Sequence, residues 1–391
     1  MDITLSSKML NFQESIFNEL SSYKKRKQQA GHDIIDLSIG SPDLPPPAYV
    51  MDELAQQAKN PDLYGYSLTG TADLHKAISE YYRRQFEVVV EEGNEVLMVM
   101  GSQDGLVHLP MVLTNQGDIV LVPDPGYTAY AAGITLAGAT PYGMPLKAEN
   151  HFLPDLENIP LEILEKAKLM ILNFPGNPVP ALATEEFFHR VIQFAKKYNI
   201  VILHDFAYSE IYYDEKPVSF LSVEGAKEVG VEFNSLSKSF NMAGCRIGYI
   251  VGNPVIVDAL NRLKSNLDYG VFLPIQKAAI LALKNSSGFS EQLRDTYKQR
   301  RDILVKGLCE AGWQVEAPKA SMFLWAKVPA PYSSTEFAYR LLDETGIVVT
   351  PGNAFGNEGE GYVRIALVQK EELLEKAGAL LKQSSLFSVR V

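Results

Sequence analysis

The chain has 391 residues, with 36 Lys and Arg against 47 Asp and Glu, and a formal net charge of −11 when the histidines are neutral. An acidic chain lacks the basic surface that a nucleic-acid backbone attracts, so nucleic-acid binding is not expected. Apolar residues make up 46% of the chain, which excludes a disordered protein and is enough for large cores in two or three domains.

Cysteine and histidine are sparse. Cys245 and Cys309 lie far apart in the sequence, which fits neither a disulfide framework nor the CxxC pairs of thiolate zinc sites. The six histidines are scattered, without an HxxxH pair. We therefore expect no metal centre and a reducing compartment.

Nothing in the sequence indicates export or a membrane. Acidic residues such as Glu14 and Glu19 interrupt the N-terminal apolar positions, unlike a secretory signal. The apolar runs end after a few residues, whereas a membrane-spanning helix needs about 18 in a row. We expect a cytoplasmic protein with no membrane association.

The first recognisable element is a proline-rich segment at 39–47, which predicts an extended connector rather than a helix or a central strand. Short β-branched runs then recur through the first two thirds of the chain and predict buried strands. They occupy 95–100, 119–122, 169–174, 200–203, 231–236 and 247–251. Between two of them, 184–198 places Phe187, Val191 and Phe194 at helical spacing. Alternating strands and helices predict an α/β fold with a mostly parallel sheet covered on both faces.

The pattern changes after about residue 286. A long charged helix is expected at 290–310, followed by short elements at 313–317 and 321–326 and a helix at 335–345. These elements are typical of a smaller α+β unit.

Polar side chains follow three of the predicted strands, where ligands bind in parallel sheets. Gly101-Ser102-Gln103 opens an apolar helix whose free N–H groups could hold a phosphate. Asp205 follows a buried run and needs a partner for its charge, and Lys238 follows another, where a lowered amine pKa is useful. Taken singly, they are explained by a βα turn, by a helix cap and by a solvated surface position, which is far more common for a single lysine.

Together the motifs indicate more. Ser235-x-Ser237-Lys238 precedes Arg246, with Asp205-x-x-Tyr208 and Asn177-Pro178 upstream. This set resembles the class I and II aminotransferases of fold type I, which use pyridoxal 5′-phosphate (PLP). The resemblance runs in family order from Gly40 to Arg364. It implies a large PLP-binding domain at 48–283 and a small domain formed by both chain ends, 1–47 and 284–391.

The resemblance implies roles for the central residues. Lys238 would form the Schiff base with PLP and shuttle the proton at the substrate Cα. Asp205 would pair with the pyridinium nitrogen, and Tyr208 and Asn177 would hydrogen-bond the phenolic oxygen of the ring. His204 should point to the opposite side of the strand from Asp205 and serve packing or support.

Other matching positions would hold the rest of the cofactor. Tyr127 would stack on the ring, while Tyr130 is expected in the core. The expected phosphate-binding residues are Ser102, Gln103, Ser235, Ser237 and Arg246. In the family, an aromatic residue of the neighbouring subunit completes this site, which implies a homodimer. We assign that role to Tyr66 rather than Tyr64.

The substrate side resembles the family with one departure. Arg364 would grip the α-carboxylate of an L-amino acid or a 2-oxo acid, with Gly40 and Asn177 beside it. Pro180 stands where the family usually has Gly, so the loop after Asn177 is expected to differ. No second arginine can be assigned to a distal substrate carboxylate.

The segments 204–208 and 265–276 are similar to the diaminopimelate and alanine aminotransferase branch. A PLP-dependent C–S β-lyase is the nearest alternative, because it shares the lysine, aspartate and arginine set. A non-catalytic PLP-binding regulator would carry a DNA-binding domain before residue 40, and the short sequence there and the acidic net charge of the chain argue against it. A nicotinamide enzyme is set aside, because no GxGxxG follows a predicted strand.

Overall fold

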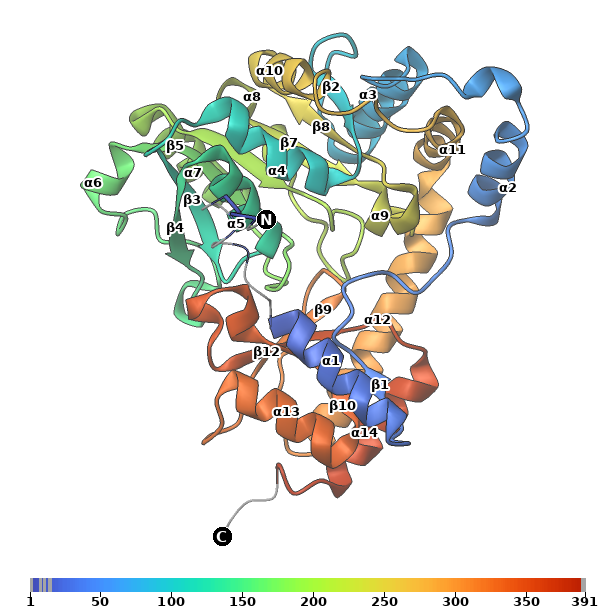
Figure 1. Cartoon of the computed structure of the whole chain (residues 1–391), viewed down its shortest axis with the longest axis vertical. Helices are drawn as coiled ribbons and strands as arrows, with labels where there is room; N and C mark the ends of the chain where they lie inside the picture. Colours follow the sequence, from blue (N-terminus) through green and yellow to red (C-terminus); the bar gives the residue numbers. More distant parts are fainter. Residues whose placement is uncertain (1–2, 7–8, 10–11, 13–15, 388–391) are drawn as a thin grey trace.

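A computed structural model describes residues 3–6, 9, 12 and 16–387 of the chain, apart from the side chain of residue 287. A seven-stranded sheet in the order β2-β8-β7-β6-β5-β3-β4 forms its centre (Figure 1). The strands are β2 (Val96–Val99), β3 (Ile119–Asp124), β4 (Thr140–Pro145), β5 (Ala167–Leu172), β6 (Val201–Asp205), β7 (Gly230–Ser235) and β8 (Gly248–Gly252). Strand β8 is antiparallel to both neighbours, and the other neighbouring pairs are parallel. The expected α/β fold is confirmed.

Each of the six predicted runs overlaps one strand of this sheet, whereas β4 was not predicted. Strand β4 reads Thr-Pro-Tyr-Gly-Met-Pro and lies at the sheet edge with most residues exposed or half-buried. It therefore lacks the β-branched apolar run that reveals a central strand.

Helices cover both faces of the sheet. They are α2 (Ala48–Gln57), α3 (Ala72–Phe86), α4 (Ser102–Leu113), α5 (Thr128–Ala137), α6 (Leu161–Leu164), α7 (Glu185–Tyr198), α8 (Ala226–Val229), α9 (Leu236–Ser239), α10 (Pro254–Lys264) and α11 (Leu273–Lys284). Alternate strand residues face opposite cores. In β5, Met170 and Leu172 pack with α3, α7 and α11, and Leu169 and Ile171 pack with α4, α5 and α10. Thr184 caps the predicted helix α7 by accepting a hydrogen bond from the Phe187 N–H.

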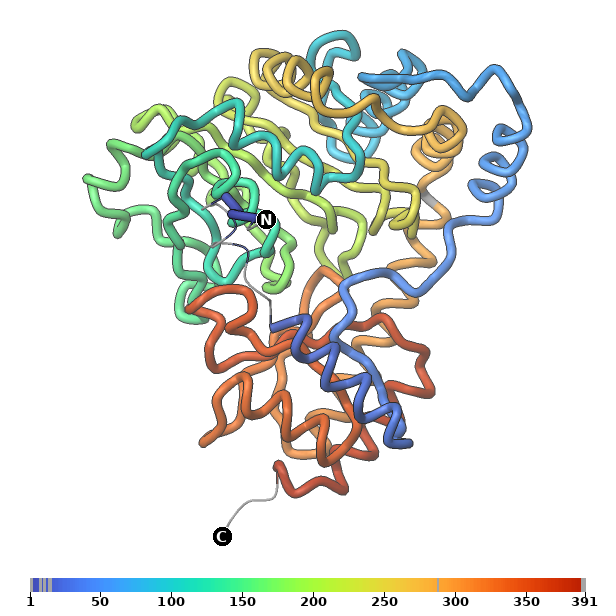
Figure 2. The backbone as a smooth tube through the Cα atoms, viewed as in Figure 1, coloured from blue at the N-terminus to red at the C-terminus, as the bar shows by residue number. Residues whose placement is uncertain are grey.

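The two ends of the chain meet in a second unit with its own core (Figure 2). It holds α1 (Ile16–Gln29), β1 (Ile35–Asp36), β9 (Phe323–Lys327), β10 (Ile347–Val348), β11 (Thr350–Pro351), β12 (Tyr362–Ala366), α13 (Ser334–Thr345) and α14 (Glu371–Gln383). The 25-residue helix α12 (Ser286–Glu310) reaches from the helices of the large sheet into this unit (Figure 1).

One predicted element of this unit is absent. Residues 313–317 form no strand. Instead, the buried Trp313 donates from Nε1 to the Lys327 carbonyl oxygen, so a side chain rather than a ladder ties the segment to β9. Among the described residues, no helix combines the length and apolarity needed to cross a bilayer.

Candidate active site

A cavity of about 750 Å³ opens between the large sheet and the second unit, at the carboxyl ends of β2, β6 and β7. It brings together nearly all of the predicted site residues. Those that line it are Gly40, Ser102, Gln103, Tyr127, Asn177, Asp205, Tyr208, Ser235, Ser237, Lys238, Arg246 and Arg364. Arg246 reaches the same edge because β8 is antiparallel and begins where its neighbours end.

One end of the cavity is an anion cup. Gly101, with φ +78°, follows β2 as the N-cap of α4, and Ser102 begins the helix beside it, so the first N–H groups of the helix face the cavity. A Cβ on Gly101 would lie 2.5 Å from Arg246 Nη2, so glycine is what lets the guanidinium approach. Ser235 caps α9 by accepting from the Ser237 N–H at 3.2 Å. Helix N–H groups, hydroxyls and a guanidinium form a donor set suited to phosphate.

Lys238 stands in the middle of the cavity. Its Nζ donates to the Gly40 carbonyl oxygen at 2.7 Å. Burial lowers the pKa of the Lys238 amine to about 8, and the positive charges of Arg364 and Arg246 act in the same direction. At pH 7, roughly a tenth of this amine is therefore an uncharged nucleophile, far more than for a lysine at its ordinary pKa of 10.5.

Asp205 ends β6 and is 4% exposed. Burial raises the pKa of its carboxyl group, while hydrogen bonds and nearby positive charges act in the opposite direction. Tyr130 donates to Oδ2 at 2.7 Å, and the Ala207 N–H donates to Oδ1 at 3.3 Å. The arrangement leaves an oriented carboxylate that can accept a further proton donor from the cavity.

Tyr130 belongs to the core, as predicted, but its contact with Asp205 was missed. It lies one helical turn after Tyr127 on α5, and Tyr127 lines the cavity. That spacing was the available signal, because residues three apart lie on one helix face.

Arg364 lies at the other end of the cavity, 3% exposed. Its Nη1 donates to Asn177 Oδ1 at 2.8 Å and its Nη2 donates to the Ser38 carbonyl oxygen at 2.6 Å. The rings of Phe323 and Phe355 lie 4.4 and 4.9 Å from the guanidinium carbon. The buried Nε has no hydrogen-bond partner in the described structure. Burial lowers the pKa of Arg364 to about 10, so the group favours an anionic ligand.

Gly40 differs from expectation in detail, whereas Asn177 keeps its expected place. A Cβ on Gly40 would lie 3.6 Å from Arg364 Nη1, an ordinary contact, so protein atoms alone do not require glycine there. Its carbonyl oxygen instead holds Lys238. Pro180 does not displace Asn177, which still lines the cavity.

Two tyrosines cover the middle of the cavity. Tyr127 donates to Gln103 Oε1 at 3.2 Å, and burial raises its pKa. Burial also raises the pKa of Tyr208, so its hydroxyl keeps its proton and can donate.

Tyr66 and Tyr64 lie outside the cavity. Tyr66 is 81% exposed and packs its ring 4.7 Å from that of Tyr269. Tyr64 donates to the Ala58 carbonyl oxygen. Neither reaches the anion cup of its own chain, so the assignment of Tyr66 to a neighbouring site stays a prediction.

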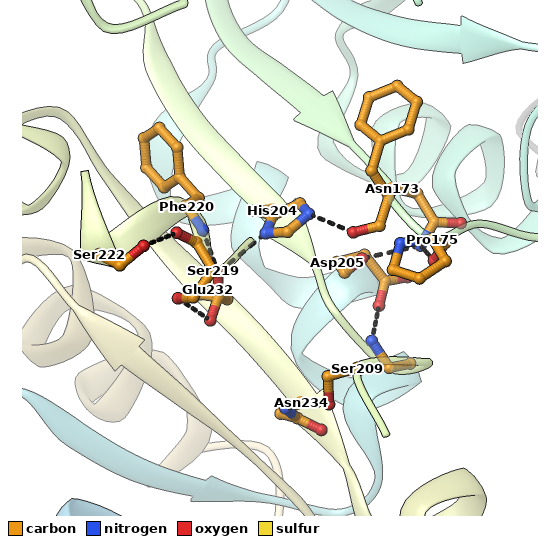
Figure 3. Close-up of polar contacts among 12 residues, drawn as sticks. Asn173, Pro175, His204, Asp205, Ser209, Ser219, Phe220, Ser222, Glu232 and Asn234 are labelled. Atoms are coloured by element: carbon orange, nitrogen blue, oxygen red, sulfur yellow. Dashed lines mark hydrogen bonds and ion pairs between the residues drawn. The ribbon is translucent and has the colours of Figure 1, made fainter. Parts of the chain in front are cut away.

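The site also contains residues that were not predicted. Asn173 follows β5 and donates to the Asp205 carbonyl oxygen at 2.7 Å (Figure 3). It also accepts from the Asn177 N–H at 2.9 Å. Its position at a strand end was a usable signal. Phe17, from α1, packs edge-on to Phe355 across the cavity mouth, and no local pattern indicates that contact. Among the described residues, no group of acidic, histidine or cysteine side chains could hold a metal ion.

Comparison with known proteins places these features in a family. The model of the class I and II aminotransferases matches residues 32–380. LL-diaminopimelate aminotransferase of Halothermothrix orenii is 44% identical over 97% of this chain and 98% of the relative. The enzyme of the same name from Dehalococcoides mccartyi is 46% identical over 96% and 98%.

Solved structures agree. Substrate-bound BacF from Bacillus subtilis superposes with a TM-score of 0.95 at 40% identity, covering 99% of both chains. A probable N-succinyldiaminopimelate aminotransferase from Thermus thermophilus gives a TM-score of 0.90 at 32% identity, covering 94% of this chain and all of that one. These matches favour amino transfer over the lyase and the regulator, and they confirm fold type I. The chain belongs to the class I and II aminotransferases and is an enzyme of that family.

Proposed function

We propose that the chain transfers an amino group between an L-amino acid and a 2-oxo acid with PLP held in this cavity. One observation carries the proposal: the nucleophilic Lys238 stands between an anion cup and a buried arginine with an unpartnered Nε. The cavity is lined by three basic side chains, Lys238, Arg246 and Arg364, and by one acidic side chain, Asp205. This excess of basic groups suits a ligand with a phosphate at one end and a carboxylate at the other. The donors and the glycine cradle therefore fit PLP.

When bound, PLP supplies an aldehyde carbon for amino exchange and a ring that withdraws electrons from the substrate Cα. Lys238 would attach the cofactor and, once released, would hold at Nζ the proton removed from Cα. Asp205 would keep a proton on the ring nitrogen, and Tyr130 orients its carboxylate. Tyr208 would donate toward the ring oxygen.

The remaining residues hold the substrate and cover the ring. Arg364 binds the α-carboxylate in a bidentate pair, helped by Asn177. Phe355 and Phe17 exclude water from that end, since both line the cavity. Tyr127 covers one face of the ring.

The cofactor assignment is tested by chemical trapping. Borohydride added to the PLP-loaded protein should fix the cofactor to one peptide, and mass spectrometry should locate it on Lys238. Lys238→Ala should trap none. Attachment elsewhere, or trapping in Lys238→Ala, would contradict the assignment.

We propose a donor of the diaminopimelate type, because the curated relatives are named for LL-diaminopimelate. Single-turnover rates with LL-diaminopimelate, alanine, phenylalanine and aspartate would rank the donors. A faster rate with phenylalanine than with LL-diaminopimelate would contradict this choice and still leave amino transfer intact.

We also propose a homodimer with shared sites. Exposed apolar side chains lie on the two segments that Ser67 and Gly270 join by a β-bridge. They are Tyr64, Tyr66, Leu68, Leu267, Tyr269 and Phe272. A second copy would cover them and place Tyr66 at the partner anion cup. Mixing Tyr66→Ala with Lys238→Ala chains should then restore activity through one intact site per mixed dimer, whereas inactive mixtures would contradict shared sites.

We propose two domains, 48–283 and both chain ends, 1–47 with 284–391, because most residues of each core come from one of these parts, although Ala207, Tyr208, Ile211 and Tyr213 pack into the core of the chain ends. Proteolysis at the connections, with both pieces of the small domain released together, would test this division. The protein is proposed to work in the cytoplasm.

A further inference from the structure

A buried ion pair lies directly behind Asp205. His204 precedes Asp205 on β6 and packs on the opposite face of the sheet, as predicted, with no exposed surface. Its Nδ1 lies 2.8 Å from Glu232 Oε2 (Figure 3). Its Nε2 lies 3.0 Å from the Phe174 carbonyl oxygen. The contacts join the end of β5 to β6 and β7.

Glu232 has donors on both oxygens. Oε1 accepts from the Tyr82 and Ser219 hydroxyls, both at 2.8 Å. Oε2 accepts from the Phe220 N–H at 2.9 Å as well as from His204. An ionised carboxyl group can only accept hydrogen bonds, and each oxygen of this fully buried group has two neighbours that can donate to it.

The partners of His204 determine its charge. The Phe174 carbonyl oxygen and an ionised Glu232 can only accept hydrogen bonds, so both ring nitrogens must donate. A histidine with two N–H donors is a cation. The geometry therefore assigns an imidazolium to a position next to Asp205.

The surroundings strengthen the effect of that charge. The rings of Phe206 and Phe188 lie 4.9 and 5.1 Å from the imidazole, so water is excluded. Glu232 is the ionisable group that contacts the ring among the described residues, and Tyr82 reaches it through Glu232. In such a medium a charge acts over a longer distance than in water. The positive charge of His204 lowers the pKa of Asp205, against the burial that raises it.

The same contacts fix a loop of the site. His204 holds the Phe174 carbonyl oxygen, and the neighbouring Asn173 holds both the Asp205 carbonyl oxygen and the Asn177 N–H. Asn177 in turn accepts from Arg364. The segment 173–177 thus contacts His204, Asp205 and Arg364, the residue proposed to bind the substrate carboxylate (the substrate clamp).

We propose that His204, kept as a cation by Glu232, is a positioning residue that keeps Asp205 ionised and holds the loop that presents Asn177. The proposal rests on the proposed role of Asp205 opposite the cofactor ring nitrogen. It assigns Glu232 a part in the same support, although Glu232 touches neither the cavity nor a ligand.

The charge is tested first in the cofactor-free protein, which makes the result independent of catalysis. Nitrogen NMR of protein labelled at histidine should show two protonated ring nitrogens for His204 at neutral pH, with the signal assigned by its loss in His204→Gln. A single protonated ring nitrogen of His204 in the wild-type chain would overturn the proposal. The charge is measured on the wild-type protein, and the His204→Gln variant serves only to assign the signal.

The coupling to Asp205 is tested with Glu232→Gln, which retains the Nε2 contact with Phe174 and removes the anion. We expect the Asp205 carbon NMR titration to move up by about one pH unit, a tenfold change in proton affinity. In the holoenzyme, kcat should fall by roughly the same factor at acidic pH while KM stays within about twofold, because the substrate clamp is untouched. His189→Gln, on the exposed face of α7, is the matched control.

An unmoved Asp205 titration in Glu232→Gln would overturn the coupling. Equal losses in Glu232→Gln and His189→Gln would also overturn it, since only His204 has the buried pair. If Asp205→Asn retained full turnover, the proposed role of Asp205 would fail, whereas the NMR result on His204 would stand by itself.

Discussion

The Tyr130 hydroxyl donates a hydrogen bond to Asp205 on the cavity side of the sheet. Removing this hydroxyl gives a quantitative prediction. Tyr130→Phe deletes one oxygen and leaves the ring in the core, where the residue is 2% exposed. The lost contact is a hydrogen bond of 2.7 Å to a buried carboxyl group.

The magnitude follows from the charge on the acceptor. A hydrogen bond to a charged group contributes roughly 1.5–3 kcal/mol, and one pKa unit corresponds to about 1.4 kcal/mol. This bond lowers the pKa of Asp205 against the burial that raises it, so its loss moves the pKa further up. We expect an increase of about one to two units.

The assay is the pH dependence of kcat between about pH 5 and pH 9. The acid limb of Tyr130→Phe should move to higher pH by the same one to two units, because less Asp205 is ionised at a given pH, and turnover on the alkaline side should be retained. Tyr213→Phe is the control, since it loses a buried hydrogen bond of 2.6 Å to the Ser321 carbonyl oxygen, and neither residue lines the cavity. An unmoved acid limb in Tyr130→Phe, or an equal movement in the control, would refute the reasoning.

Three further predictions concern the anion cup, the clamp and the lysine. Gly101→Ala should weaken PLP binding, because its Cβ would lie 2.5 Å from Arg246 Nη2. Gly117 has a similar positive φ and no atom within 4 Å of a Cβ, so Gly117→Ala should bind PLP normally. Equal PLP affinities of the two variants in a fluorescence titration would contradict this prediction. Arg364→Lys should raise the substrate dissociation constant about 10- to 150-fold in stopped-flow half-reactions, since the bidentate fork is lost, and a change under about twofold would place the carboxylate elsewhere. The Lys238 pKa of about 8 lies below its ordinary 10.5, so the folded state holds fewer protons than the unfolded state between these values and stability should rise with pH there. Urea unfolding of the cofactor-free proteins should show the wild type gaining up to about 3 kcal/mol relative to Lys238→Met across that window, and parallel curves would contradict the lowered pKa.

Several of the predicted site residues share one property: they belong to local motifs at strand ends. Asp205, Lys238 and Ser102 follow buried strands, and parallel topology carries such positions to one edge of the sheet. Arg364 and Gly40 come from the second unit, and only the family resemblance brought them into the set. The order of the family motifs along the chain therefore predicted these two site residues, whereas the predicted strand order did not.

Other contacts depend on how elements pack, which local patterns do not encode. Tyr130 meets Asp205 because α5 turns one face toward the end of β6, and Phe17 reaches the cavity because α1 crosses its mouth. Glu232 was not predicted because its partners come from β6, α3 and a turn far apart in the sequence. Tyr66 faces away from the cavity of its own chain, so a second chain decides its role.

The half-reaction tests the central claim most directly. PLP-loaded protein is mixed with an amino acid in the absence of any 2-oxo acid, and the cofactor absorbance and the released 2-oxo acid are followed together. We predict conversion to the pyridoxamine form with one 2-oxo acid released per site, and no conversion in Lys238→Ala. An unchanged spectrum with every amino acid, or pyruvate and ammonia released while the original spectrum returns, would contradict amino transfer by this chain.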